Sequence, residues 1–107
     1  MTQTTEERIA AIRAKRRDKA YDHLAQYAPI WLVDEKVLLD EDAILFNVVF
    51  YHPRYGWVNR RYRYDAFADV LYQRGQHLVD EDEALEIQQQ EPFIVAPTVN
   101  TVEAYGG

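Results

Sequence analysis

The sequence predicts an α+β domain in which a long N-terminal helix packs on a small antiparallel sheet, followed by short C-terminal helices and a mobile tail. Three observations support this fold class. Residues 5–28 carry apolar side chains at helical spacing, and residues 43–51 form a run of β-branched and aromatic side chains. Residues 53–56 contain proline and glycine, which favour a turn, so a central hairpin is expected over about residues 43–64.

The N-terminal helix begins at a capping box, because Thr4 is followed three residues later by Glu7. Apolar side chains then fall on one side at helical periodicity, and these are Ile9, Ile12, Ala20, Leu24, Tyr27 and Trp31. We expect the second half of this helix to pack on the sheet. The first half is basic all round, so it is expected to project into solvent or onto a partner. Pro29 marks the end of the regular pattern.

The next segments predict the sheet. Residues 30–33 are expected to form a short strand and residues 40–42 a loop. The run at 43–51 is apolar on both faces, which indicates a central strand with cover on each side. The hairpin returns as a strand over 57–64.

Alternation along the returning strand separates its side chains into two sets. Val58, Tyr62 and Tyr64 share one face with Arg60. The more polar set is expected to meet solvent or a partner, and it consists of Trp57, Asn59, Arg61 and Arg63.

Residues 65–75 allow two interpretations. A helix with Asp65 as N-cap and Gly75 just after its end is slightly favoured over a hairpin whose third strand is 70–73. A further helix is expected to begin at Asp80, with acids in its first turn, and to end before Pro92. Residues 93–95 are expected to add an edge strand.

Composition limits the function classes. Residues 1–96 are expected to form one domain and 97–107 a flexible tail. The 107 residues include no cysteine and no serine, which excludes disulfides, thiolate ligands and serine nucleophiles. The N-terminus has no apolar leader and no apolar run approaches the roughly 20 residues of a membrane helix. We therefore expect a cytoplasmic protein without membrane contact, metal or cofactor.

The charge is distributed unevenly along a chain whose net charge is −6. Residues 8–19 hold six Lys or Arg against one acid, and residues 80–91 hold six acids and no base. Such polarity can steer a partner or arrange self-association. The blander interpretation is two solvated helix faces.

The candidate binding surface lies in the stretch 51–64, which holds four arginines, four tyrosines and one tryptophan. Arginine and aromatic side chains are enriched at binding surfaces because they provide contact area, stacking and planar hydrogen bonding. The candidate partner-binding residues are Arg54, Tyr55, Trp57, Arg61 and Arg63. A secondary contact is expected from the basic helix at Arg13, Arg16 and Arg17.

The leading hypothesis is a non-catalytic module that binds a protein partner or a second copy, since phosphate-loop, dinucleotide and nucleophile-elbow motifs are missing. Nucleic-acid binding is the alternative, and it requires the basic helix and the hairpin arginines to form one continuous face. A ligand-binding or enzymatic domain is the third hypothesis. It requires a cavity near His52, the candidate acid/base, on which Tyr51, Tyr62 and Arg60 converge.

Overall fold

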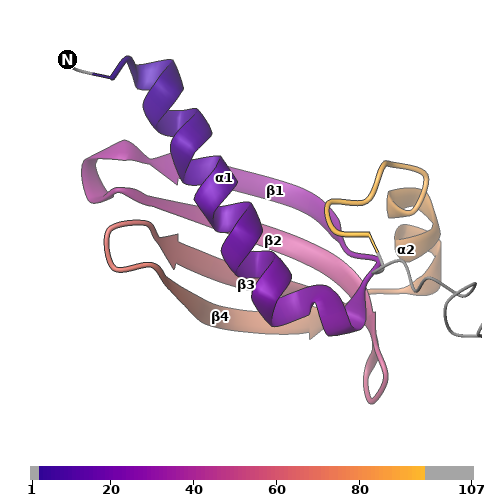
Figure 1. Cartoon of the computed structure of the whole chain (residues 1–107). Coiled ribbons are helices and arrows are strands. Elements are labelled where there is room, and N and C mark those ends of the chain that lie inside the picture. The colour runs from indigo at the N-terminus through magenta and orange to yellow at the C-terminus, as the bar shows by residue number, and fades with distance from the viewer. Residues whose placement is uncertain (1–2, 96–107) are drawn as a thin grey trace, which may run out of the picture.

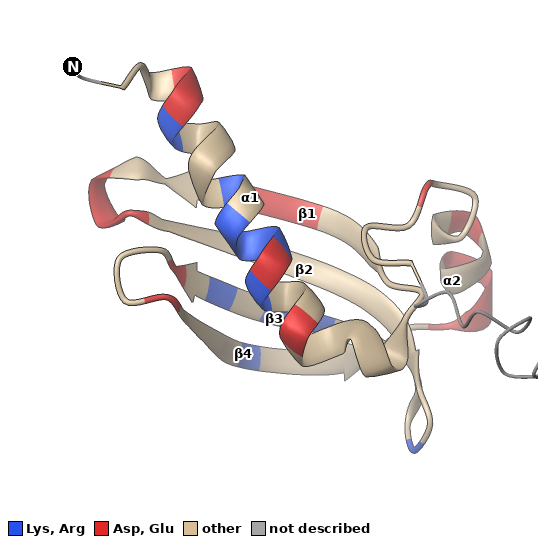
Figure 2. Cartoon of the chain, in the orientation of Figure 1, with Lys and Arg blue, Asp and Glu red and all other residues tan. Residues whose placement is uncertain are grey.

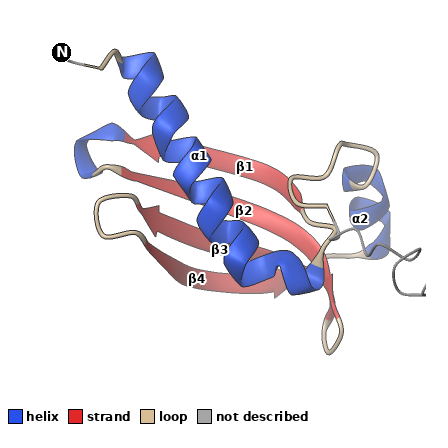
Figure 3. Ribbon diagram, in the orientation of Figure 1, coloured by secondary structure: helices blue, strands red, loops and turns tan. Residues whose placement is uncertain are grey.

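The structure, a computed structural model, describes residues 3–95 and has one long helix lying across one face of a four-stranded antiparallel sheet (Figure 1). Its elements are α1 (Thr5–Leu24), the 3-10 turn η1 (Ala25–Tyr27), β1 (Trp31–Leu38), the 3-10 turn η2 (Leu39–Glu41), β2 (Ala43–His52), β3 (Gly56–Asp65), β4 (Val70–Leu78) and α2 (Glu81–Ile87). The strands lie side by side in chain order, as Figure 3 shows. The predicted fold class is confirmed, while the expected tail at 97–107 lies outside the described residues.

Helix α1 starts where the capping box predicts. The Thr4 hydroxyl accepts a hydrogen bond from the Glu7 backbone N–H, and the Glu7 carboxylate accepts one from the Thr4 backbone N–H. The side chains that it buries follow a four-residue spacing, and they are Ile12, Arg16, Ala20 and Leu24. Contact with the sheet therefore starts already at Ile12, in the half of the helix that was expected to project.

Residues 65–75 form a turn and a strand, so the favoured helix prediction for this segment is wrong. The Asp65 carboxylate accepts a hydrogen bond from the Ala68 backbone N–H within the turn. Asp69 has a φ of 56° and Gly75 a φ of 132°, and neither value is compatible with an α-helix. Phe67, which a helix would have buried, is 90% exposed at the turn.

The outer strands were harder to predict than the central hairpin. Strand β1 extends past the predicted 30–33 to Leu38, through charged residues that gave no apolar signal. Residues 93–95 form no strand, because only a single bridge joins Ile94 to Ile30. The predicted central hairpin is confirmed. Strands β2 and β3 pair without a register shift, from the Ala43–Asp65 pair to the His52–Gly56 pair.

The core has two parts of unequal size. The larger part lies between α1 and the sheet and includes Phe46, Phe50, Tyr62 and Tyr64. The smaller part lies on the opposite face, where Ala84 of α2 packs with Val49 and Val79. Strand β2 contributes to both parts, as its two apolar faces predicted.

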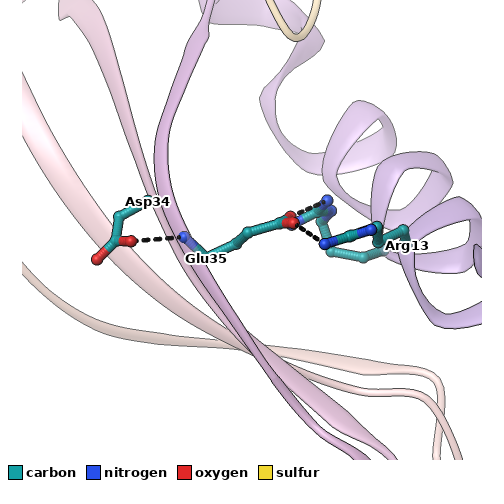
Figure 4. Close-up of polar contacts among 4 residues, drawn as sticks. Arg13, Asp34 and Glu35 are labelled. Atoms are coloured by element: carbon teal, nitrogen blue, oxygen red, sulfur yellow. Dashed lines mark hydrogen bonds and ion pairs between the residues drawn. The ribbon is translucent and has the colours of Figure 1, made fainter. Parts of the chain in front are cut away.

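One charged residue is buried between α1 and the sheet. The Arg16 side chain is 3% exposed, and its Nη2 donates a hydrogen bond of 2.8 Å to Oε1 of Glu35 in β1. The other carboxylate oxygen of Glu35 pairs with Nη2 of Arg13 at 2.6 Å (Figure 4). The Arg16 guanidinium also lies 5.0 Å from the ring centres of Phe46 and Phe93. The carboxylate of Glu35 therefore neutralises the buried guanidinium of Arg16.

The same arrangement shifts the pKa of Glu35. Burial alone would raise this pKa, but the hydrogen bonds and charges of Arg16 and Arg13 outweigh burial and hold it below its ordinary value of 4.5. The Asp34 carboxylate accepts a 2.9 Å hydrogen bond from the Glu35 backbone N–H, which fixes the strand beside the pair (Figure 4).

Replacing Glu35 by alanine is expected to lower the free energy of unfolding by about 3 kcal/mol, because the Arg16 charge stays buried without its partner. Arg13→Ala is the matched control and should cost less than about 1 kcal/mol, since the Arg13 side chain is half exposed. Urea unfolding measures both. An equal loss of free energy of unfolding in the two variants would show that Glu35 does not stabilise the buried charge of Arg16.

The Glu35 pair is also expected to make stability depend on pH. Because the folded-state pKa lies below the ordinary value, the stabilisation is complete above about pH 4.5 and is lost as the pH falls through the folded-state pKa. The stability difference between the wild type and Glu35→Gln should therefore narrow as the pH is lowered from neutral into the acidic range. A difference that stays constant down to acid unfolding would contradict the pairing.

Candidate functional site

The face of the sheet opposite α1, here called the outer face, is crossed by rows of paired residues. Paired residues of antiparallel neighbours point to the same side. Four rows cross the outer face: Trp31, Val49, Asn59 and His77; Asp34, Asn47, Arg61 and Gly75; Lys36, Leu45, Arg63 and Tyr72; and Leu38, Ala43, Asp65 and Val70. These residues alternate along β2 and β3 with Phe46 and Tyr62, which pack in the core beneath α1. The predicted division of the two faces of β3 is therefore confirmed.

Helix α2 covers one end of the outer face. Its Ala84 packs with Val49, and its Ile87 belongs to the same cluster as Trp57 and Val33. In Figure 1, α2 lies at the end of the sheet toward which β4 runs. The rows that contain Arg61 and Arg63 lie farther along the strands and have no second layer among the described residues.

The uncovered part of the outer face, here called the open patch, is basic. It has four cations against one carboxylate, and it consists of Asp34, Lys36, Leu45, Asn47, Arg61, Arg63, Tyr72 and Arg74. Arg74 occupies a β-bulge in β4, and it lines a hollow of about 170 Å³ together with Asp34, Lys36, Leu45 and Asn47. Only Arg63 of the four cations has a carboxylate within 4.0 Å in the described part of the chain, at 3.2 Å from Glu41.

Gly75 allows Arg61 to lie flat across β4. A Cβ built at Gly75 would come within 2.5 Å of Nη2 of Arg61, so the guanidinium occupies the space of the missing side chain. The φ of 132° at Gly75 is also a conformation that residues with a Cβ rarely adopt. A 3.4 Å contact between Nη1 of Arg61 and Nδ1 of His77 holds the side chain in the same position. The backbone of β4 thus fixes the position of one arginine of the open patch.

The remaining hairpin residues lie away from the open patch. Arg54 and Tyr55 are exposed in the β2–β3 turn, where the Arg54 guanidinium lies 5.8 Å from the centre of the Tyr55 ring. Trp57 is half buried, with its ring centre 6.0 Å from that of Trp31 and 5.6 Å from that of Tyr51. These three rings line a shallow hollow of about 320 Å³. Trp57 is therefore a packing residue as well as a surface residue.

The secondary contact predicted on α1 divides into buried and exposed residues. Arg16 is buried against the sheet, so it presents no surface to a partner. Arg13 and Arg17 are exposed, and Arg17 lies 5.7 Å from the Phe93 ring centre. Arg13 and Arg17 lie on α1, which packs on the inner face of the sheet. Arg61 and Arg63 lie on the opposite, outer face. The continuous basic face that the nucleic-acid hypothesis required does not exist in the described structure.

Tyr51 does not converge with the other three residues of the third hypothesis, which share the α1 side of the sheet. Tyr51 points to the outer face, while Arg60 and Tyr62 point beneath α1. Nη1 of Arg60 donates to the Tyr62 hydroxyl and Nε of Arg60 donates to Gln76. Burial raises the pKa of Tyr62, and Arg60 opposes that rise. Nδ1 of His52 accepts the Arg54 backbone N–H, and its ring lies 4.7 Å from that of Tyr55.

A hollow of about 470 Å³ lies beside α1 and the β3–β4 turn. Asp69 lines it and accepts a 2.6 Å hydrogen bond from the Tyr64 hydroxyl. The same carboxylate pairs with Lys19 at 3.0 Å. The hydrogen bond from Tyr64, followed by that from Lys19, lowers the pKa of Asp69, while burial and this carboxylate raise the pKa of Tyr64. These groups satisfy one another and tie the turn to α1.

Two cations of the open patch were missed by sequence reasoning. Lys36 and Arg74 lie in β1 and β4, the strands whose extent or existence the sequence did not reveal. A period-two pattern of charges at Asp34 and Lys36 was the available signal for β1. Among residues 3–95, no group of three His, Asp or Glu side chains could hold a metal ion, and neither helix is long and apolar enough to cross a membrane.

Gly75→Ala is expected to lower the free energy of unfolding by about 2 kcal/mol, because alanine is strained at this backbone conformation. Repeating the substitution in an Arg61→Ala background separates the two contributions. The cost should fall only slightly there, since the guanidinium can move while the backbone strain remains. Thermal or urea unfolding of the four proteins completes the cycle, and a Gly75→Ala protein as stable as the wild type would contradict the described geometry.

No protein-family model matches this chain, and no curated protein or solved structure matches it either. The function proposed below is therefore argued from the geometry and chemistry of the described residues.

Proposed function

We propose that this chain is a small, non-catalytic cytoplasmic module that binds a protein partner through the open patch, with Arg54 and Tyr55 of the hairpin turn as an additional contact. The observation that carries the proposal is the concentration of four cations on one uncovered sheet face of a chain whose net charge is −6. A cationic surface of this kind on an acidic protein can attract a partner of the opposite charge.

The composition of the open patch supports the same proposal. Three of its cations are arginines, whose planar guanidinium groups bind carboxylates in a bidentate manner and stack on aromatic rings. Tyr72 is 49% exposed beside Arg63, and Leu45 lies between them and Lys36 in the same row. Arginine together with exposed aromatic and aliphatic surface is typical of interfaces with proteins. A partner surface rich in carboxylates is the natural complement.

The test is a capture experiment with tagged protein, nuclease treatment and identification of bound molecules by mass spectrometry. Arg61→Glu combined with Arg63→Glu is expected to abolish capture of the specific partner, because both changes reverse the charge of the open patch. Both side chains are half-buried on the sheet surface and Arg63 loses its ion pair with Glu41, so the free energy of unfolding should fall by about 1 to 2 kcal/mol while the variant stays folded. Trp57 is left intact, since its loss would also remove core packing.

Lys15→Glu combined with Arg17→Glu is the matched control. It changes the net charge by the same amount, but on the side of the molecule that α1 covers. Retention of the partner by this control and its loss in the open-patch variant support the proposal. Equal capture by both variants would contradict it, and capture of nuclease-sensitive material alone would replace the protein partner by a nucleic acid.

A further inference from the structure

We propose that the open patch binds helix α2 of a second copy of this chain, which forms a symmetric dimer. This inference rests on the proposed function, because it names the occupant of the same surface. The placement, the charge and the exposed side chains of α2 each match the open patch.

Helix α2 and the open patch both lie on the outer face of the sheet. Helix α2 covers one end of this face, and the open patch lies farther along the strands, toward the opposite end. A two-fold axis that runs across the strands, between two stacked outer faces, exchanges the two ends of the sheet. It therefore places α2 of each copy over the open patch of the other copy. The contact is made twice by the same surfaces, so the assembly closes as a dimer.

The charges of the two surfaces are complementary. Four acids of α2 are exposed, and these are Glu81, Asp82, Glu83 and Glu86. The helix contains no base (Figure 2). The open patch carries Lys36, Arg61, Arg63 and Arg74. The acids of α2 have no ion-pair partner within 4.0 Å among residues 3–95, and neither do Lys36, Arg61 and Arg74. Within one copy, the open patch contains Asp34 and the Arg63–Glu41 pair, so three of its four cations remain without an ion pair for the acids of α2 of another copy.

Apolar side chains accompany the charges on both surfaces. Leu85 of α2 is 59% exposed next to Glu86, although α2 packs on the sheet through Ala84 and Ile87. The open patch offers Leu45 and the half-exposed ring of Tyr72. Burial of these groups would add a non-directional attraction to the ion pairs. The contact is therefore expected to weaken in high salt without depending on charge alone.

The test is the molar mass of the full chain by sedimentation equilibrium, over a series of protein concentrations at low and high salt. The wild type should be dimeric at low salt. A face variant, Arg61→Glu with Arg74→Glu, and a helix variant, Glu83→Lys with Glu86→Lys, should each weaken dimerisation at least about 100-fold, because each juxtaposes like charges. Lys15→Glu with Arg17→Glu should dimerise like the wild type.

Mixing the face variant with the helix variant provides the decisive outcome. Each contact in the mixed pair again joins opposite charges, so a heterodimer should form although each variant alone is monomeric. Recovery of the dimer also shows that both variants are folded. A wild type that stays monomeric at all concentrations, or a dimer that neither variant weakens, would overturn the inference. In either case, loss of a captured partner in Arg61→Glu with Arg63→Glu would still support the proposed function.

Discussion

A single helix can cover only one face of a four-stranded sheet, and this constraint determines most of the structure. Helix α1 covers the face that carries Phe46, Phe50, Tyr62 and Tyr64. The second helix has only seven residues, so it covers one end of the outer face and leaves the rest in contact with water. The side chains follow this division, since the outer face is apolar beneath α2 and is occupied by arginine, lysine and asparagine beyond it.

Arg16 of α1 occupies a buried position facing the sheet, where an apolar side chain such as leucine would be expected. Arg16 stands one turn after Ile12 and one turn before Ala20 on the buried stripe, so its charge enters the interface with them. Two aromatic rings and one carboxylate of β1 surround the guanidinium, while its Nε and Nη1 lack a hydrogen-bond partner in the described structure. Buried ion pairs often stabilise a fold no more than apolar contacts of the same size, and here the pair joins one residue of α1 to one residue of β1.

The parts of the fold that could be predicted are those in which local pattern and tertiary environment agree. The hairpin of β2 and β3 follows from a β-branched run, a proline–glycine turn and a period-two alternation, and the same alternation placed Arg61 and Arg63 on one face. Strand β4 could not be distinguished from a helix, because Asp65 and Gly75 are favourable at helix ends as well as in turns. Only Arg61 and Arg63 of the four cations of the open patch were predicted from the sequence. Lys36 and Arg74 belong to the patch because of strand order and register, which one sequence does not reveal. Burial of Arg16 depends on a carboxylate nineteen positions away in sequence, which helical periodicity alone does not predict.

The two register shifts of the sheet both involve its outer strands, one in β1 after Leu32 and one in β4 at Arg74. An outer strand presents unpaired backbone groups on which another chain could form a new strand pair. A bulge interrupts the regular spacing of these groups, and charged side chains at Glu35, Lys36 and Arg74 add a desolvation cost to any such pairing. The chain therefore carries protection against edge-to-edge polymerisation at both borders of its sheet. Such protection disfavours association through the borders of the sheet and leaves its faces as the surfaces for ordered association.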